Sequence, residues 1–271
     1  MAALAVRLTP HRSTPAALWW CSAVLGFLGW GCSALRHDLL QSNAYDLGLF
    51  DQWVWLIGRG LEPVSSMEHV HVLADHGAWL LYGAGAAYGL LPGVHWLLAS
   101  QAIALSFTAI PIWWLGQQAG LTPKHCWLAC ALWWLQPVVF NTILFDFHPE
   151  TWVMPAFALA LWAERAAKPR LWLALLLLML GARDGLILVI AGMALDLGWR
   201  QRWRWCAAAG GLSIVWLLIL SQGLYPLLRG GSGPKAAERM FGHLGGGFLS
   251  LLSSLEWGEI AFYLLILSLP L

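Results

Sequence analysis

The stretch from Leu171 to Leu197 reads LWLALLLLMLGARDGLILVIAGMALDL, and it decides how the chain folds. As one straight helix it would be about 40 Å long, whereas the apolar core of a bilayer is only about 30 Å thick. Arg170 precedes the stretch and Arg200 follows it, and basic residues favour the cytoplasmic side of a membrane. We therefore expect a hairpin of two short helices whose turn, Gly181 to Gly185, lies in a protein-lined recess below the outer surface.

The composition of the whole chain is that of a membrane protein. Of its 271 residues, 59% are hydrophobic and 11% are charged, with a mean hydropathy of +0.66, which excludes an ordinary water-soluble domain. Apolar runs cover Ala16 to Leu35, Val94 to Leu115 and Trp203 to Ile219, and they are continuous rather than alternating, which favours helices over a β-barrel. We expect an all-α fold, a polytopic membrane helix bundle of about seven spans that forms one domain over residues 1–271.

Basic residues assign the two sides of the membrane. Four clusters near span ends should be cytoplasmic: Arg7 with Arg12, Lys124, Arg165 to Arg170, and Arg200 to Arg204. With the N-terminus cytoplasmic in the inner membrane, two large outer loops would cover about residues 36–93 and 223–250. His76 to Leu91 would be a helix that lies at the interface or re-enters the membrane. All acidic residues except Glu164 and Asp196 would then lie outside, so we expect any chemistry on that face.

Charge and cysteine use disfavour two other classes of protein. The formal net charge of +1 argues against bulk electrostatic attraction to nucleic acid. The five cysteines lie in or beside apolar runs rather than in loops, so we do not expect a disulfide framework. The sequence leaves the oligomeric state open.

The first candidate motif is YDLGLFDQ, Tyr45 to Gln52, directly after the first span. One of its two carboxylates, Asp46 or Asp51, could be a catalytic base. The five-residue spacing does not place both on one helix face, so we expect them to have different roles. The alternative is that Asp46 caps the helix that follows and Asp51 is merely solvated.

The second candidate motif is EHVHVLADH, Glu68 to His76. In an extended loop, His69 and His71 would direct both imidazoles to one side, where they could bind a divalent metal together with a carboxylate. His76 follows Asp75 in the same segment and is a candidate supporting residue. The alternative is that these are ordinary surface histidines of an outer loop.

The third candidate motif is FDFHPE, Phe145 to Glu150, at the mouth of a predicted span. In an extended backbone, the alternating Asp146, His148 and Glu150 would point in a common direction and could hold a metal or a phosphate. Polar groups crowded at a membrane boundary are costly unless they are used, which favours a function over simple interfacial anchoring.

The fourth candidate motif is GARDG at the tip of the predicted hairpin. Arg183 offers the paired donors that suit phosphate oxygens, with Asp184 in a supporting role. The alternative is an internal ion pair between this turn and a neighbouring helix.

The order of these motifs resembles an uncharacterised membrane family, the domain of unknown function 2079, from roughly Tyr45 to the end. The resemblance is carried by YDLGLFDQ, by Asp75-His76 before an apolar helix, by FDFHPE, by the position of GARDG and by GPKAAERMFGHLGGG. That family in turn is similar to the GT-C glycosyltransferases, which use polyprenyl-phosphate-linked sugars. The resemblance implies that Asp46 or Asp51 is the catalytic base or metal contact, and that Asp146 with Glu150 is the second acidic group.

The chain departs from the family pattern in two ways. Relatives usually show Lys-Glu-Asp in the short hairpin, where this chain has Ala182, Arg183 and Asp184. The chain also ends earlier than members usually do, which suggests a C-terminally truncated reading frame or a short variant that lacks the distal spans.

Sequence and resemblance together favour a membrane enzyme that transfers a sugar from a polyprenyl-phosphate donor to an acceptor on the outer face. Its partners would be the lipid bilayer and the polyprenyl-phosphate sugar, with a divalent metal as a candidate cofactor. Two alternatives stay open, a polytopic transporter and a non-catalytic membrane protein. A transporter should carry ionisable residues near mid-membrane, whereas a scaffold should leave Asp46, Asp51, Asp146 and His148 far apart.

Overall fold

The computed structural model describes residues 13–229 and 257–268, and this part of the chain is helical, without strands. Helices along the long axis of the molecule are α1 (Ala16–Asp38), α5 (Val94–Phe107), α6 (Ala109–Gln118), α7 (Pro123–Trp134), α8 (Pro137–Leu144), α9 (Val153–Arg165), α10 (Pro169–Leu180), α11 (Leu186–Trp199) and α12 (Trp203–Leu218). The helix of α12 continues through a π-helix η2 (Ile219–Leu224) into α13 (Tyr225–Arg229). The remaining elements are α2 (Ala44–Gly58), α3 (Val72–Asp75), α4 (Leu80–Leu90), the 3₁₀-helix η1 (Pro149–Trp152) and α16 (Trp257–Ser268).

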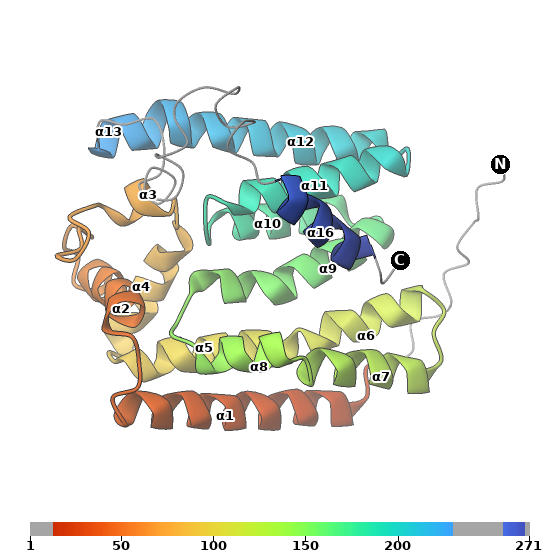
Figure 1. Cartoon of the computed structure of the whole chain (residues 1–271), viewed down its shortest axis with the longest axis horizontal. Helices are drawn as coiled ribbons and strands as arrows, with labels where there is room; N and C mark the ends of the chain where they lie inside the picture. Colours follow the sequence, from red (N-terminus) through yellow and green to blue (C-terminus); the bar gives the residue numbers. More distant parts are fainter. Residues whose placement is uncertain (1–12, 230–256, 269–271) are drawn as a thin grey trace.

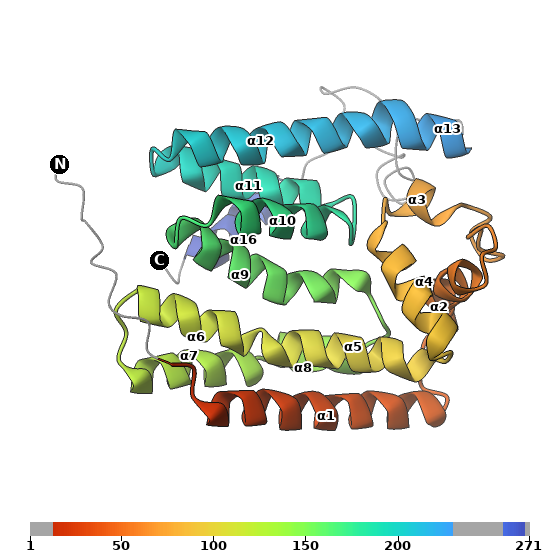
Figure 2. The ribbon, with the colours of Figure 1, turned by 180° about the vertical axis from the view of Figure 1, so that it is seen from behind.

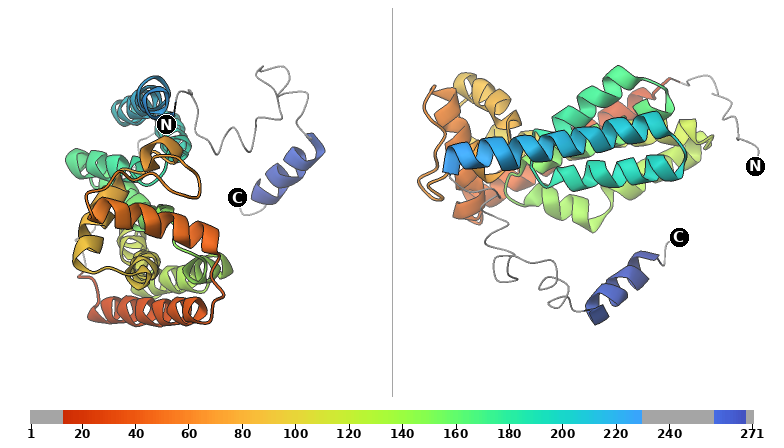
Figure 3. Two further views of the ribbon diagram at one scale, coloured as in Figure 1. Left: turned by 90° about the vertical axis from the view of Figure 1, so that its left-hand side faces the viewer. Right: turned by 90° about the horizontal axis from the view of Figure 1, so that it is seen from above.

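The long helices stack in layers from α1 at one side to α12 at the other (Figure 1). Helix α1 packs on α5 and α8, α6 packs on α7 and α9, α9 packs on α10, and α11 packs on α12. Seen from behind, α9 lies between α10 and α5 (Figure 2). Figure 3 shows α16 to one side of this stack. The expected all-α membrane bundle is confirmed.

Three described helices are long and apolar enough to cross a membrane: Ala16–Asp38, Val94–Gln118 and Trp203–Arg229. The pair α7 and α8, bent by 46°, would make a fourth. Helices α9, α10 and α11 have 13, 12 and 14 residues, so each is only about 20 Å long and shorter than a bilayer core. The expected count of about seven spans therefore stays a prediction.

The hairpin expected between residues 171 and 197 is present as α10 and α11. Helix α10 ends at Leu180 and α11 begins at Leu186, with the GARDG turn between them. Both helices contribute to one hydrophobic core with α9 and α12, through side chains that include Leu176, Met179 and Ile190. The two arms are thus short because the chain reverses at GARDG, where Gly181 and Ala182 are buried and Gly185 is exposed.

The stack has one acidic end and one basic end. Helices α2, α3 and α4 cover the end at which α1, α8, α10 and α13 terminate (Figure 1). Connections at the opposite end join α6 to α7, α9 to α10, and α11 to α12, and they carry or adjoin Lys124, Lys168 and Arg200 to Arg204. The fold thereby separates the candidate site from the basic clusters along the length of the bundle.

The last long helix differs from the sequence expectation at its C-terminal end. The helix continues to Arg229, whereas the second outer loop was expected to begin near residue 223. Gly223 does not end the helix because it lies inside the π-helical segment, which inserts extra residues into the turn without breaking it. Most of that expected loop, including GPKAAERMFGHLGGG, lies outside the described residues.

Candidate functional site

Two acidic groups from distant segments meet at the start of α2. Asn43 caps this helix, because its Oδ1 accepts the backbone N–H of Tyr45 at 2.9 Å. The backbone N–H of Asn43 donates to Asp146 Oδ2 at 2.7 Å, and its side-chain Nδ2 donates to Asp46 Oδ2 at 3.2 Å. One residue therefore joins the carboxylate of YDLGLFDQ to that of FDFHPE.

Asp146 is held as a buried, fully engaged carboxylate. Its side chain has no exposed surface, and Arg36 Nη1 donates to its Oδ1 at 2.8 Å. The same Arg36 nitrogen donates to the carbonyl of Leu144 at 3.1 Å. Because both carboxylate oxygens of Asp146 already bind donors, this residue fixes the start of α2 against the end of α8.

The two aspartates of YDLGLFDQ have different partners, as their spacing indicated. Asp46 lies partly exposed in the first turn of α2, where the positive end of the helix dipole stabilises its charge. Asp51 accepts the hydroxyl of Tyr88 from α4 at 2.7 Å. Burial and then the nearby Asp51 raise the pKa of Tyr88, so this phenol stays protonated. Neither alternative holds, since Asn43 is the cap and Asp51 is hydrogen-bonded.

Gln101 holds the backbone of FDFHPE in place from the middle of the bundle. Its fully buried amide donates to the carbonyls of Thr142 and Phe145 at 2.7 and 3.0 Å. Its Oε1 accepts the backbone N–H of His148 at 3.0 Å. These three bonds satisfy backbone groups that the end of α8 would otherwise leave unpaired in an apolar environment.

The three polar side chains of FDFHPE do not act on one common partner. Asp146 binds Arg36, whereas Glu150 forms an ion pair with Arg183. His148 lies between them, with Nδ1 2.9 Å from the carbonyl of Asp146. The motif therefore links two groups of charges, because η1 turns the chain between His148 and Glu150.

The second group of charges is built where two turns meet. The backbone N–H of Asp184 donates to the carbonyl of His76 at 2.7 Å, and that of Leu80 donates to the carbonyl of Gly181 at 2.9 Å. Gly77 has a φ of +60°, a conformation that glycine adopts without strain. The turn after ADH and the GARDG turn are thereby locked together.

Carboxylates outnumber guanidinium groups in this second group. Arg183 is paired with Glu150 and lies in the field of Asp184 and Asp75. Burial lowers the pKa of Arg183, but the carboxylates, Glu150 above all, outweigh burial and raise it. Asp184 Oδ2 also accepts the hydroxyl of Tyr225 from α13 at 2.8 Å. Arg183 thus forms an internal ion pair, which was the alternative to phosphate binding that the sequence left open.

Phe50 lies between the two groups of charges. Its buried ring is 5.3 Å from the ring of His148, 5.6 Å from that of His76 and 5.7 Å from that of Phe147, centre to centre. His76 in turn lies with its Nδ1 2.5 Å from Asp75 Oδ2. Phe50 of YDLGLFDQ thus contacts residues of EHVHVLADH and FDFHPE, and GARDG joins the same site through the backbone of His76 and the ion pair of Arg183 with Glu150.

A family model described as a predicted membrane protein, DUF2079, matches residues 36–268. The chain belongs to this family. No curated protein and no solved structure matches it. The matched region of this DUF2079 chain begins at Arg36, so it includes both groups of charges.

Sequence reasoning misses some of the residues that build the candidate site of this DUF2079 protein. Arg36 and Asn43 both fall in the stretch that the sequence predicts as the first outer loop, where polar residues are common. The sequence signal that could have pointed to this site is Gln101, because a single amide inside an apolar span needs hydrogen-bond partners from another segment. Tyr225 could not be found because the helix was expected to end before it.

The histidines of EHVHVLADH have separate roles in this chain. His71 caps α3 by accepting the N–H of Leu73 on Nδ1 at 3.1 Å, while its Nε2 lies 3.4 Å from the hydroxyl of Tyr82. His69 is exposed. In the part of the chain that the structure describes, no three His, Cys, Asp or Glu side chains are arranged as metal ligands. A divalent metal thus stays a proposal.

Proposed function

We propose that this chain is a membrane glycosyltransferase that moves a sugar from a polyprenyl-phosphate donor to an acceptor hydroxyl on the outer face. The observation that carries the proposal is the meeting of Asp46 and Asp146 at Asn43, beside the charged group around Arg183. A partly exposed carboxylate is thereby placed at the same end of the bundle as an arginine that can bind phosphate. The order of the motifs resembles that of the DUF2079 family, and the similarity of this family to GT-C enzymes favours the same reaction.

Asp46 is the proposed catalytic base. Its hydrogen bond to Asn43 uses only Oδ2, so Oδ1 can accept a proton from an acceptor hydroxyl. As that proton moves to Asp46, the acceptor oxygen bonds to the anomeric carbon and the bond from carbon to phosphate oxygen breaks. The electron pair leaves on the polyprenyl phosphate, and the anomeric centre is inverted.

Arg183 is the proposed phosphate ligand. The donor phosphate would replace Glu150 as its partner. Guanidinium binds phosphate with two parallel hydrogen bonds, and about a third of this side chain is exposed. Asp75, Glu150 and Asp184 together exceed the positive charge of Arg183 and of Arg229, which lies near Tyr225. An incoming phosphate would add to that negative charge, which is the reason to propose a divalent cation as its companion.

The proposed topology has the N-terminus in the cytoplasm, about seven spans in the inner membrane and the site outside. The separation of the basic end from the acidic end supports it. A transporter is the weaker alternative, because it needs ionisable groups near mid-membrane. Charged side chains of the described long helices lie in their first or last turns, as Arg36, Glu164 and Arg204 do.

A gene deletion and complementation experiment tests the transfer reaction. Mass spectrometry of cell-envelope glycolipids and glycoproteins should show one sugar modification that requires the intact full chain. Asp46→Asn should lower its amount at least about 100-fold, the scale of a lost general base. The matched control is Asp38→Asn, which removes the same charge from a side chain that is 61% exposed, and it should retain activity within about twofold.

Protein levels in the membrane separate chemistry from folding in this experiment. Asp46→Asn should insert and unfold like the parent, whereas Asp146→Asn should lower both activity and the unfolding temperature, because it weakens the anchor of α2. Full activity of Asp46→Asn, or no glycan difference between deletion and intact strains, would refute the proposal.

A further inference from the structure

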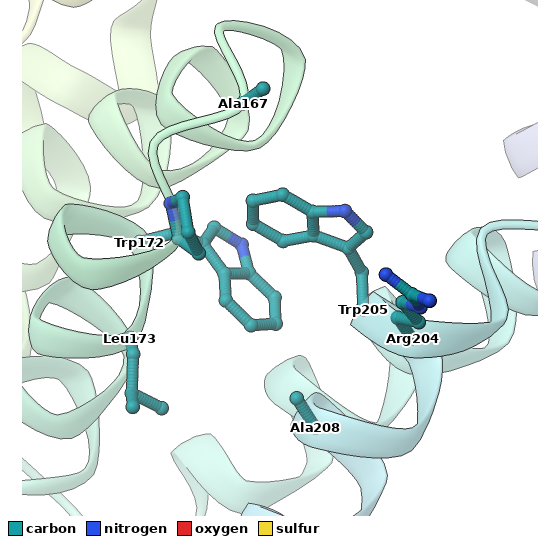
Figure 4. A pocket seen from close by; sticks show the side chains of 7 residues that line it. Ala167, Trp172, Leu173, Arg204, Trp205 and Ala208 are labelled. Atoms are coloured by element: carbon teal, nitrogen blue, oxygen red, sulfur yellow. The ribbon is translucent and has the colours of Figure 1, made fainter.

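A cavity lies at the basic end of the bundle, far along the molecule from the charged groups of the candidate site. It has a volume of about 470 Å³ and opens between the first turns of α10 and α12 (Figure 4). Its lining residues come from the connection before α10, from α10 and from α12: Ala167, Pro169, Trp172, Leu173, Arg204, Trp205 and Ala208. One cationic side chain thus stands in an otherwise apolar lining.

The walls of this cavity suit a hydrocarbon chain. Trp172 and Trp205 both line the cavity and meet edge to face between α10 and α12, with ring centres 4.8 Å apart (Figure 4). Leu173 and Ala208 continue the apolar lining along the two helices and are exposed. Exposed apolar side chains on the helices of a membrane protein are suited to contact with lipid acyl chains.

Within the described residues, the positive charge that lines this cavity, Arg204, has no carboxylate partner, unlike the arginines next to it. Arg200 pairs with Asp196 and Glu164, and Arg202 pairs with Glu164. Within residues 13–229 and 257–268, by contrast, no carboxylate pairs with Arg204, nor with Lys168 or Arg170, which flank the lining residue Pro169. Lys168 lies over the ring of Trp162 at 5.0 Å, which leaves its charge in place.

We propose that this cavity binds an anionic phospholipid of the bilayer leaflet at the basic end. The lipid phosphate binds Arg204, supported by Arg170 and Lys168, and one acyl chain lies against Trp172 and Leu173. Basic cavities between membrane helices on the cytoplasmic side favour anionic head groups, and guanidinium binds phosphate through paired donors. The assignment is independent of the proposed transferase reaction, since it uses other residues at the other end.

Lipid retention by the purified full chain tests this site. In nanodiscs or detergent, native mass spectrometry should show phosphatidylglycerol bound in preference to phosphatidylcholine. Arg204→Ala should weaken phosphatidylglycerol binding about tenfold, and Ala208→Phe should do the same by filling the cavity. The matched control is Arg59→Ala, since Arg59 is also an exposed arginine beside a tryptophan, Trp55, but lies at the other end.

Each result of the experiment decides the assignment. A loss of lipid in Arg204→Ala and Ala208→Phe, but not in Arg59→Ala, supports the site. Equal retention of the two lipids overturns it, and so does wild-type binding by Ala208→Phe. Complete displacement of the lipid by an equal concentration of inorganic phosphate would also overturn it, because the apolar walls would then contribute nothing. Unfolding temperatures of all variants control for misfolding.

Discussion

Burial separates the roles of two aspartates that look alike in the sequence. Asp146 has no exposed surface, and Arg36 and the N–H of Asn43 occupy both of its oxygens. Asp46 is partly exposed, and its bond to Asn43 occupies one oxygen. A carboxylate can act as a base only if the hydroxyl that gives up the proton can reach it. Asp46 therefore suits catalysis, and Asp146 suits the positioning of α2.

His71 should make the protein less stable in mild acid. Burial lowers the pKa of His71 from its usual 6.5, and the nearby Glu62 only partly opposes this shift. Protonation would also cost the bond in which Nδ1 accepts the N–H of Leu73. As the pH falls through the usual pKa, the unfolded chain takes up a proton before the folded chain does, so the free energy of unfolding decreases. The loss ends below the folded pKa, where both states are protonated.

The comparison of the parent with His71→Asn isolates this effect. Asparagine caps helices well but does not titrate, so the variant should keep α3 and lose this part of the pH dependence. Thermal unfolding followed by tryptophan fluorescence from about pH 8 to about pH 5 measures it. Parallel pH profiles of the two proteins would show that His71 is not responsible.

At the scale of elements, α2 and α4 cross closely because glycines lie at the contact. A Cβ on Gly58 would come within 2.7 Å of the carbonyl oxygen of Gly85, and a Cβ on Gly85 would overlap the side chain of Ile57. This contact holds α4, with Tyr88, against the helix that carries Asp46 and Asp51. Close packing of the two backbones therefore fixes the position of Tyr88 relative to Asp51.

Gly85→Val should destabilise the protein by about 1–3 kcal/mol, the usual cost of forcing extra atoms into a packed contact. The matched control is Gly83→Val on the same helix, because a Cβ at Gly83 meets nothing within 4 Å. Both changes have the same intrinsic effect on helix formation, so the difference between their unfolding temperatures measures the crossing alone. Equal effects of the two changes would mean that α2 and α4 are not packed as described.

The elements themselves were largely predictable, but their pairing was not. The hairpin of α10 and α11 followed from the length of the apolar stretch and the arginines at both of its ends. Nothing local indicated that His76 and Asp184 would share a backbone hydrogen bond, since they are distant in sequence. Long-range hydrogen bonds between turns depend on tertiary packing, which one sequence does not encode in any local pattern.

At the scale of the molecule, segregation of charge was the feature that the sequence predicted best. The positive-inside rule, applied to the helix ends, predicts that the basic clusters lie together at one end of the bundle. The sequence alone leaves open whether Asp46 and Asp146 converge, and in the structure both carboxylates accept hydrogen bonds from Asn43. Helix lengths were harder to predict. Gly223 lies inside a π-helical segment and does not end its helix, whereas Pro137 begins a new helix, α8, within a stretch expected to be one span.

The two ends of the bundle should lie on opposite sides of the inner membrane. Glu62 is exposed at the acidic end and Lys124 is exposed at the basic end, so single cysteines at these positions report the two sides. In a parent with exposed Cys32 replaced by serine, a membrane-impermeant maleimide should label Glu62→Cys in intact spheroplasts. Lys124→Cys should be labelled only after permeabilisation, because basic connections stay in the cytoplasm. The reverse pattern would place Asp46 in the cytoplasm and remove it from an outer-face donor, and labelling of both in intact spheroplasts would mean that the bundle does not cross the membrane along its long axis.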